Sequence, residues 1–409
     1  MTSLAELNLD STLIDEPRMF AYRLARLQAE LSAAGVDAML CCDPVNTRYA
    51  TGIRNMQVWA FHSLIRMGLI PASGRAVVFE YAGSEHLADG LDTIGEVLPA
   101  IPLHFGPGYD DAQNRDRLDR WVDSVRSAAI ANCGGTGRLA IDNQVPHVAG
   151  EALKVSGFEL VQAYPLLARA MAAKNEDEIR AMKYSIEVAE IGIERLRDAI
   201  SPGRSENELW AILNHTNIEH GGEYMDTRLL SSGPRTNPWY QECGSRRIEA
   251  GDMIALDTDM IGPYGYDADV SRSFVCEPEL ATTRQKEIYR VAYDHIQHNL
   301  ELVAPGAGFR ELSERAFVVP ERYREQSITM NWHGIGLYGG WPTILGNGCF
   351  DATSEDGELV PGMTLCVESY VGETGGPDGV KLEEQVLVTE NGYRLLSQFP
   401  FETGMLGAG

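Results

Sequence analysis

The amino-acid sequence predicts two domains, an α/β domain over residues 1–173 and an α+β domain over residues 174–409. The chain has 409 residues, more than one ordinary hydrophobic core accommodates. Short apolar runs alternate with helical stretches in the first part, whereas the second part runs as helices, strands, helices and strands again. Hydrophobic residues make up 44% and charged residues 23% of the chain, a balance typical of globular proteins.

The first domain is expected to open with an amphipathic helix over residues 17–35, because leucines recur there at helical spacing and Gly35 stops the pattern. A short strand, Ala38–Cys42, follows and leads into a loop at Asp43. Later strands are expected at Gly68–Pro71, Ala76–Phe79 and Leu139–Asp142, with helices at 114–130 and 148–154. This alternation favours a parallel or mixed sheet.

The second domain is expected to begin with a long helix over residues 176–200, which is acidic in its first turns and apolar along one face. A second helix follows at 206–221. The pattern then changes to strands and turns at 251–256, 262–265 and 271–276. The remaining elements are helices at 284–303 and 308–316 and strands at Met363–Val371 and Val380–Thr389.

The net charge and the cysteine content indicate which partners and which cellular compartment to expect. With 34 basic against 59 acidic residues, the formal charge is −25, so nucleic acid and anionic membrane surfaces are not expected as partners. No signal peptide and no membrane-spanning run is visible. The seven cysteines are odd in number and lack the spacing of a zinc site, which favours reduced core cysteines in a cytoplasmic protein.

Carboxylates interrupt strands of the second domain that are otherwise apolar. Asp257 and Asp259 end the run that starts at Met253, and side chains two residues apart on a strand point to the same face. Asp269 follows after a turn of the length of a hairpin, which would bring it beside the first pair. Glu368 and Glu383 each stand inside one of the two last strands.

A histidine, His333, stands next to glycines that allow close approach of the backbone. Any one of these groups alone is more often a solvated carboxylate or a hydrogen-bonded core histidine. Several carboxylates buried together, however, require cations to neutralise them. Oxygen-rich ligation with one imidazole suits two divalent ions of iron, manganese, cobalt or zinc.

The stretch Gly334–Gly339 matches the dinucleotide-binding pattern G-x-G-x-x-G. It follows His333 and does not close a strand in a βαβ unit, so loop geometry explains it better.

The order Asp, Asp, His, Glu, Glu, together with the segments 264–272 and 381–389, resembles the pita-bread family of methionine aminopeptidase, prolidase and creatinase. The resemblance covers about residues 174–409, and the segment 43–52 is similar to the creatinase-type N-terminal domain. It implies two metal ions bridged by Asp269 and Glu383, with His333 and Glu368 on one ion and Asp257, Asp259 or both on the other. The peptidases carry a second histidine where this chain has Gly340, and an upstream histidine near Trp239 or Tyr240.

A closer resemblance is to the DddP-type dimethylsulfoniopropionate (DMSP) lyases. It rests on the segments 55–59, 227–239, 241–244 and 362–368 and on the paired Asp257 and Asp259, and it runs through both domains. That group's proposed catalytic base, an aspartate, is Gly339 here, and a tyrosine of the group is Ile328.

This resemblance implies a metal-dependent lyase that cleaves a small carboxylate such as DMSP to dimethyl sulfide and acrylate. An Xaa-Pro dipeptidase-like hydrolase and a non-catalytic pita-bread binding protein are the alternatives. A homodimer is expected by resemblance. Aromatic side chains suit a cationic sulfonium group, although core packing explains any single one equally well; the candidates for substrate binding are Trp239, Tyr240, Trp332 and Trp341. Tyr338 is the candidate for the missing catalytic group.

Overall fold

The computed structural model describes residues 13–103, 110–346 and 348–406 and divides the chain into two compact units. One unit comprises Asp15–Met171; the other comprises Ala172–Gly409 with the segment that ends at Ile14. The chain therefore pairs an α/β unit with an α+β unit, as the sequence predicts.

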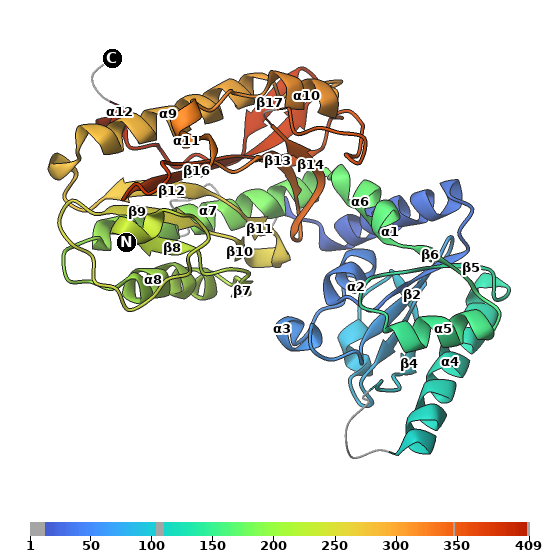
Figure 1. Ribbon diagram of the computed structural model, residues 1–409. Coiled ribbons are helices and arrows are strands. Elements are labelled where there is room, and N and C mark those ends of the chain that lie inside the picture. The colour runs from blue at the N-terminus through green and yellow to red at the C-terminus, as the bar shows by residue number, and fades with distance from the viewer. Residues whose placement is uncertain (1–12, 104–109, 347, 407–409) are drawn as a thin grey trace. The chain divides into compact units, whose positions relative to one another are not determined.

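A six-stranded mixed sheet forms the α/β unit, in the order β4-β3-β2-β1-β5-β6 (Figure 1). β1 runs parallel to β5 and antiparallel to β2. The strands are β1 (Ala38–Cys41), β2 (Met67–Pro71), β3 (Ala76–Glu80), β4 (Ile94–Pro99), β5 (Arg138–Ile141) and β6 (Glu159–Gln162). The helices are α1 (Glu16–Ala33), α2 (Pro44–Thr51), α3 (Gln57–Ala60), α4 (Asp111–Cys133), α5 (His147–Val155) and α6 (Tyr164–Ala172).

Local sequence signals explain where the first helices begin. The Asp15 carboxylate accepts a hydrogen bond from Arg18 N at the start of α1, and the Asp43 carboxylate accepts from Val45 N and Asn46 N at the start of α2. These bonds satisfy backbone N–H groups that have no partner inside the helix. β4 and β6 were not predicted, because most of their residues are exposed or half-buried and form no apolar run.

In its described residues, the α+β unit contains three small sheets and four main helices. The sheets have the orders β12-β9-β8, β11-β10-β7 and β14-β13-β15-β16-β17. Their strands are β7 (Tyr224–Met225), β8 (Leu230–Ser232), β9 (Met253–Asp257), β10 (Met260–Ile261), β11 (Asp267–Ala268), β12 (Ser271–Val275), β13 (Met330–Ile335), β14 (Gly339–Leu345), β15 (Thr364–Gly372), β16 (Gly379–Thr389) and β17 (Gly392–Leu395). The main helices are α7 (Glu176–Ala199), α8 (Glu206–Glu219), α9 (Thr283–Glu301) and α10 (Phe309–Arg315); short helices α11 (Glu321–Arg324) and α12 (Thr403–Leu406) follow.

The strands of this unit lie between two helical layers (Figure 1). α9 and α10 pack with β15 and β16 in one hydrophobic core, and α7 and α8 pack with β9 and β10 in another. The Ser273 hydroxyl of β12 donates to Lys381 O and accepts from Lys381 N of β16, both at 3.0 Å. This pair of bonds joins two sheets and brings the end of β9 close to the middle of β16.

Candidate metal centre

The six predicted metal ligands come together in the α+β unit. Asp257 ends β9, Asp269 lies between β11 and β12, His333 lies on β13, and Glu368 and Glu383 are directly opposite each other on β15 and β16. We call these five residues and Asp259 the carboxylate centre. Five of the six are buried, and Asp259 is half-buried.

Strand alternation explains why the ligands of β15 and β16 share one face. Leu365 and Val367 on β15, and Leu382 on β16, belong to the core beneath α9. Glu368 and Glu383 alternate with them and therefore point to the opposite face.

His333 faces three carboxylates through one ring nitrogen. Its Nε2 lies 3.3 Å from Glu383, 3.5 Å from Asp269 and 3.7 Å from Glu368. Its Nδ1 donates to the carbonyl oxygen of Gly334 at 3.2 Å, which leaves Nε2 as the ligand atom when the ring is neutral. Burial opposes charging of this ring, but the hydrogen bond to Glu383 and the charge of Glu368 raise its pKa to about 9.

Lys381 supplies an ammonium group inside the same cluster. Its Nζ lies 2.7 Å from Glu383, 3.0 Å from Glu368 and 3.2 Å from Asp257, and its side chain is 2% exposed. Burial would raise the pKa of Glu383, but Lys381 and His333 outweigh it and hold that pKa below its usual value.

Asp259 is held in an unusual backbone conformation beside Asp257. Its φ is +35°, a value that residues other than glycine rarely adopt. The Thr227 hydroxyl donates to its carboxylate. Burial and the charge of Asp257 raise the pKa of Asp259 to about 7. Strain of this kind persists where the surrounding structure requires the side chain in one place.

Two overlapping groups of side chains have the spacing of metal ligands, with all ligand atoms of a group within 4.8 Å of one another. One group is Asp257, Asp259 and Asp269; the other is Asp269, His333, Cys366 and Glu383. Asp269 belongs to both groups, which agrees with a bridging position.

The donor atoms in these groups fit divalent cations. Asp269 Oδ1 and Glu368 Oε1 are buried, and no hydrogen-bond donor reaches either of them. Burial raises the pKa of Asp269 well above its usual value, and the charge of Glu383 adds to that rise. Buried carboxylate oxygens without donors are costly unless a cation or a proton neutralises them. Carboxylates with one imidazole match the ligands that iron, manganese, cobalt and zinc accept.

Of the four aromatic residues expected around the substrate, Trp239 and Tyr240 lie side by side, with ring centroids 6.3 Å apart, whereas the other two lie in another part of the unit. Trp332 is fully buried, on the opposite face of β13 from His333 and in the core beneath α9, which leaves it no face toward the carboxylates. Trp341 packs on Phe309 in the same core, with ring centroids 5.4 Å apart. Trp239 is 7% exposed and stacks on Tyr370. Tyr240, in contrast, is 69% exposed.

Tyr338, Gly339 and Gly340 lie where β13 turns back into β14. Tyr338 is half-buried and Gly339 is exposed. A Cβ atom built on Gly339 would lie 3.9 Å from His333 Nδ1, and one built on Gly340 would meet only backbone oxygens. This turn thus lies next to the metal-binding histidine, but neither glycine contributes a side chain. Ile328 packs against the Trp239 cluster.

Three residues near the centre escaped the sequence analysis. Lys381 stands two residues before Glu383 in a buried strand, so the alternation that places Glu383 also places Lys381 on the same face. Cys366 stands two residues before Glu368 by the same rule. Asp267 precedes Asp269 by two residues and is 3% exposed, with Oδ1 lacking a hydrogen-bond donor. Strand period applied to every polar residue, not only to the expected ligands, would have found all three.

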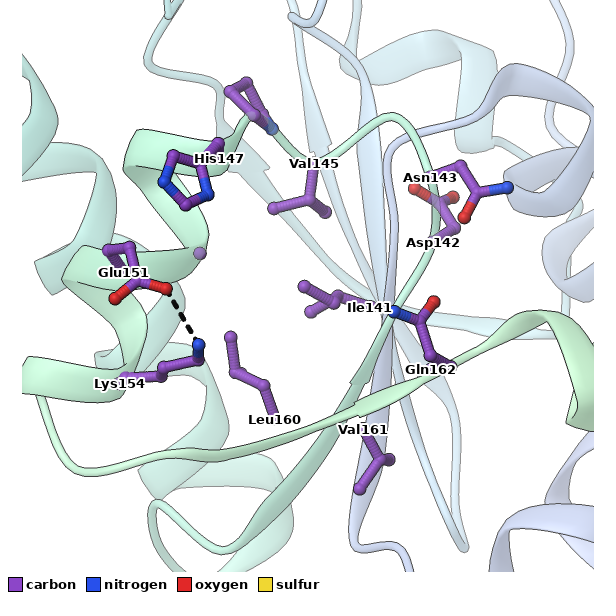
Figure 2. Close-up of a pocket in the computed structure, with 12 residues that line it drawn as sticks. Ile141, Asp142, Asn143, Val145, His147, Glu151, Lys154, Leu160, Val161 and Gln162 are labelled. Atoms are coloured by element: carbon purple, nitrogen blue, oxygen red, sulfur yellow. Dashed lines mark hydrogen bonds and ion pairs between the residues drawn. The ribbon is translucent and has the colours of Figure 1, made fainter.

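A separate pocket of about 330 Å³ lies in the α/β unit, beside α5 and the carboxyl ends of β5 and β6. Figure 2 shows its polar side chains, among them Glu151 and Lys154, which pair with each other at 2.7 Å. All twelve residues that line this pocket belong to the α/β unit.

Comparison with known proteins covers both units. Residues 180–390 match the metallopeptidase family M24, and residues 23–80 match the creatinase/prolidase N-terminal domain. The dimethylsulfoniopropionate lyase DddP of Roseovarius nubinhibens is 37% identical over 97% of this chain and 89% of its own length. The lyase DddP of Roseobacter denitrificans is 35% identical over 99% of this chain and 92% of its own.

Solved structures agree on the fold. The Xaa-Pro dipeptidase from Bacillus anthracis has a TM-score of 0.76 at 21% identity and covers 94% of this chain and 99% of its own. The prolidase from Pyrococcus horikoshii OT3 has a TM-score of 0.74 at 21% identity and covers 93% of this chain and 99% of its own. In the described part of this chain, no helix has both the length and the apolar composition of a membrane span.

Proposed function

Because the chain belongs to the metallopeptidase family M24 and groups there with DddP-type lyases, we propose that it is a metal-dependent lyase that cleaves DMSP to dimethyl sulfide and acrylate. One observation carries this proposal: the two lyases match nearly the whole chain at 35% and 37% identity. The prolidase structures share only the fold at 21% identity.

The carboxylate centre would hold two divalent ions of iron, manganese, zinc or cobalt. Asp269 and Glu383 would bridge them, His333 and Glu368 would complete one ion, and Asp257 with Asp259 the other. The presence of Asp269 in both ligand groups supports its shared role in this division. The bound ions would supply positive charge for the substrate carboxylate and for the charge that develops when the adjacent C–H bond is broken.

The base that removes this proton is not one of the usual residues, because position 339 is a glycine. Tyr338 stays a candidate, since it lies in the turn beside His333. The substrate's sulfonium group needs no further activation, since dimethyl sulfide leaves as a neutral molecule.

A second candidate function is hydrolysis of Xaa-Pro dipeptides, which the M24 family match favours. The centre would be the same. This chemistry has less support, because Gly340 offers no imidazole where the peptidases carry their second histidine.

Headspace gas chromatography tests the main proposal. Protein loaded separately with Fe(II), Mn(II), Co(II) or Zn(II) is incubated with DMSP and, in parallel, with a panel of Xaa-Pro dipeptides. Dimethyl sulfide above the blank with at least one metal is expected. Proline release without dimethyl sulfide would establish the hydrolase instead. A protein that takes up no stoichiometric metal would be the non-catalytic binding protein.

We also propose that the enzyme is a cytoplasmic homodimer. The seven cysteines are all unpaired, as in proteins of reducing compartments. Pairing of two chains is expected from the resemblance to two-domain relatives, and analytical ultracentrifugation of the purified protein would measure it.

A further inference from the structure

Cys366 is a fully buried residue whose thiol faces the carboxylate centre. It lies on β15, two residues before Glu368, so both side chains point to the same face of the strand. It is directly opposite His333 in the antiparallel pairing of β13 and β15, and side chains opposite each other in such a pair are neighbours. The thiol donates weak hydrogen bonds to Asp269, to Oδ2 at 3.7 Å and to the carbonyl oxygen at 3.9 Å. Contacts on two sides therefore place the sulfur in the centre.

Four side chains surround one position beside this sulfur. Asp269 Oδ2 lies 3.7 Å from Cys366 Sγ and 3.5 Å from His333 Nε2. The same nitrogen lies 3.3 Å from Glu383 Oε1. The ligand atoms of all four side chains lie within 4.8 Å of one another. We call these four residues the mixed-ligand group.

The separations within the mixed-ligand group are those of a tetrahedral metal site. Zinc binds thiolate sulfur at about 2.3 Å and imidazole nitrogen or carboxylate oxygen at about 2.0–2.2 Å. With tetrahedral angles, these bond lengths put a carboxylate oxygen about 3.6 Å from the sulfur and about 3.4 Å from the nitrogen. The observed separations are 3.7 Å for sulfur and oxygen, and 3.3 and 3.5 Å for nitrogen and oxygen. The side chains thus have the mutual spacing that one ion requires.

Hydrogen bonding by the thiol alone explains less of the geometry. A thiol is a weak donor with a single proton. Asp269 Oδ1 and Glu368 Oε1 are buried next to it without any hydrogen-bond donor, on side chains whose residues are both 5% exposed. Buried carboxylate charge of this kind needs a cation or a proton, and an ion in the mixed-ligand group would supply that charge.

We propose that Cys366 Sγ is a ligand of the metal ion in the mixed-ligand group. The inference rests on the metal centre of the proposed function and is independent of which substrate the centre serves. A thiol binds a metal ion as the thiolate, so its proton leaves to solvent when the ion binds. Glu368 Oε1, which lies 3.7 Å from His333 Nε2, would be a further oxygen ligand of the same ion. Sulfur is a softer ligand than oxygen, so this position selects zinc over manganese.

X-ray absorption spectroscopy of the zinc-loaded full-length protein tests the bond directly. We expect a Zn–S distance of about 2.3 Å beside Zn–N and Zn–O distances of about 2.0–2.2 Å. The Zn–S signal should disappear from Cys366→Ser and from Cys366→Ala, and it should persist in the matched control Cys276→Ser. Cys276 is also fully buried in this unit, but it packs in the hydrophobic core of α7 and α8. Cobalt-loaded wild type should show a sulfur-to-Co(II) charge-transfer band in the near ultraviolet that both Cys366 variants lack.

Metal titration adds a test of selectivity. Loss of groups that support a metal ligand lowers affinity about 10–100-fold, so we expect Cys366→Ser to bind zinc at least about tenfold more weakly than the wild type. Manganese affinity should fall less, because manganese prefers oxygen ligands. Equal losses for the two metals would show that Cys366 only supports the shape of the site.

The remaining outcomes separate failure of this role from failure of the proposed function. Zinc-loaded wild type without a Zn–S signal would overturn the ligand role, and no variant is needed for that result. A Zn–S signal that survives both Cys366 substitutions would also overturn it, because the sulfur would belong to another cysteine. Wild type that takes up no metal would overturn the metal centre together with this role. A Zn–S signal that depends on Cys366, without dimethyl sulfide release, would support the ligand role and overturn the lyase function alone.

Discussion

Replacing Lys381 with methionine removes a buried ammonium group that lies within 3.2 Å of three carboxylates. Methionine keeps a side chain of similar length, so the change removes charge more than volume. Breaking a buried ion pair by removing one partner costs about 3–5 kcal/mol, because the other charge stays buried without compensation. We therefore expect the metal-free Lys381→Met variant to lose about 3–5 kcal/mol of unfolding free energy.

Differential scanning calorimetry of EDTA-treated protein measures this loss. For a unit of about the size of Ala172–Gly409, 1 kcal/mol shifts Tm by about 2–4 °C, so the expected decrease is about 6–20 °C. Divalent metal should restore part of it, because the ions neutralise the same carboxylates.

Lys183→Met is the matched control. Lys183 is 47% exposed on α7 and lies 3.5 Å from Glu187, and an exposed pair of this kind contributes at most about 1 kcal/mol. If the metal-free Lys381 variant melted within 2 °C of this control, the ammonium group would not compensate the carboxylates, and the reasoning would be refuted.

Three further predictions concern the same centre. Burial and the charge of Asp257 raise the pKa of Asp259 from 3.8 to about 7. The folded, metal-free protein therefore binds this proton more tightly than the unfolded chain does. The resulting stabilisation is complete below about pH 4 and is lost as the pH rises through 7. The Tm of EDTA-treated protein should fall from pH 5 to pH 8, and a rise over that range would contradict the assignment. His333→Ala removes the imidazole ligand. The variant should bind less metal, as measured by inductively coupled plasma mass spectrometry, and its activity should fall by at least about 10²-fold. Full metal content would exclude ligation by His333. Gly339→Asp places a carboxylate about one side-chain length from His333 and should accelerate dimethyl sulfide release about tenfold or more. The control variant Gly339→Ala should not accelerate it. Equal rates for both variants would show that this position does not supply the base.

Much of the fold follows from local sequence. α7 and α9 were predicted within two residues at each end, because a long apolar face with helical period has few alternative solutions. β15 and β16 were predicted as strands of nearly the observed length, since both are rich in apolar and β-branched residues that single polar residues interrupt without a turn signal. β13 and β14 were not predicted, because glycines, asparagine and a proline interrupt their apolar pattern.

The kinds of side chain in the centre could also be inferred from sequence alone. Carboxylates placed inside strands that are otherwise apolar need a cation, whichever strands are neighbours. This argument depends on burial, which an apolar run predicts, and it identified Asp257, Asp269, Glu368 and Glu383. Their assignment as metal ligands stays a prediction.

Tertiary structure decided which groups meet. Local sequence reveals the face to which a strand residue points, but the pairing of strands far apart in the chain places Lys381 among carboxylates from β9, β15 and β16. The same limit applies to the aromatic residues: local pattern does not predict that Trp239 stacks on Tyr370 while the neighbouring Tyr240 stays 69% exposed. Composition and periodicity thus determine what is buried and on which face, whereas contacts between distant segments determine which buried charges compensate one another.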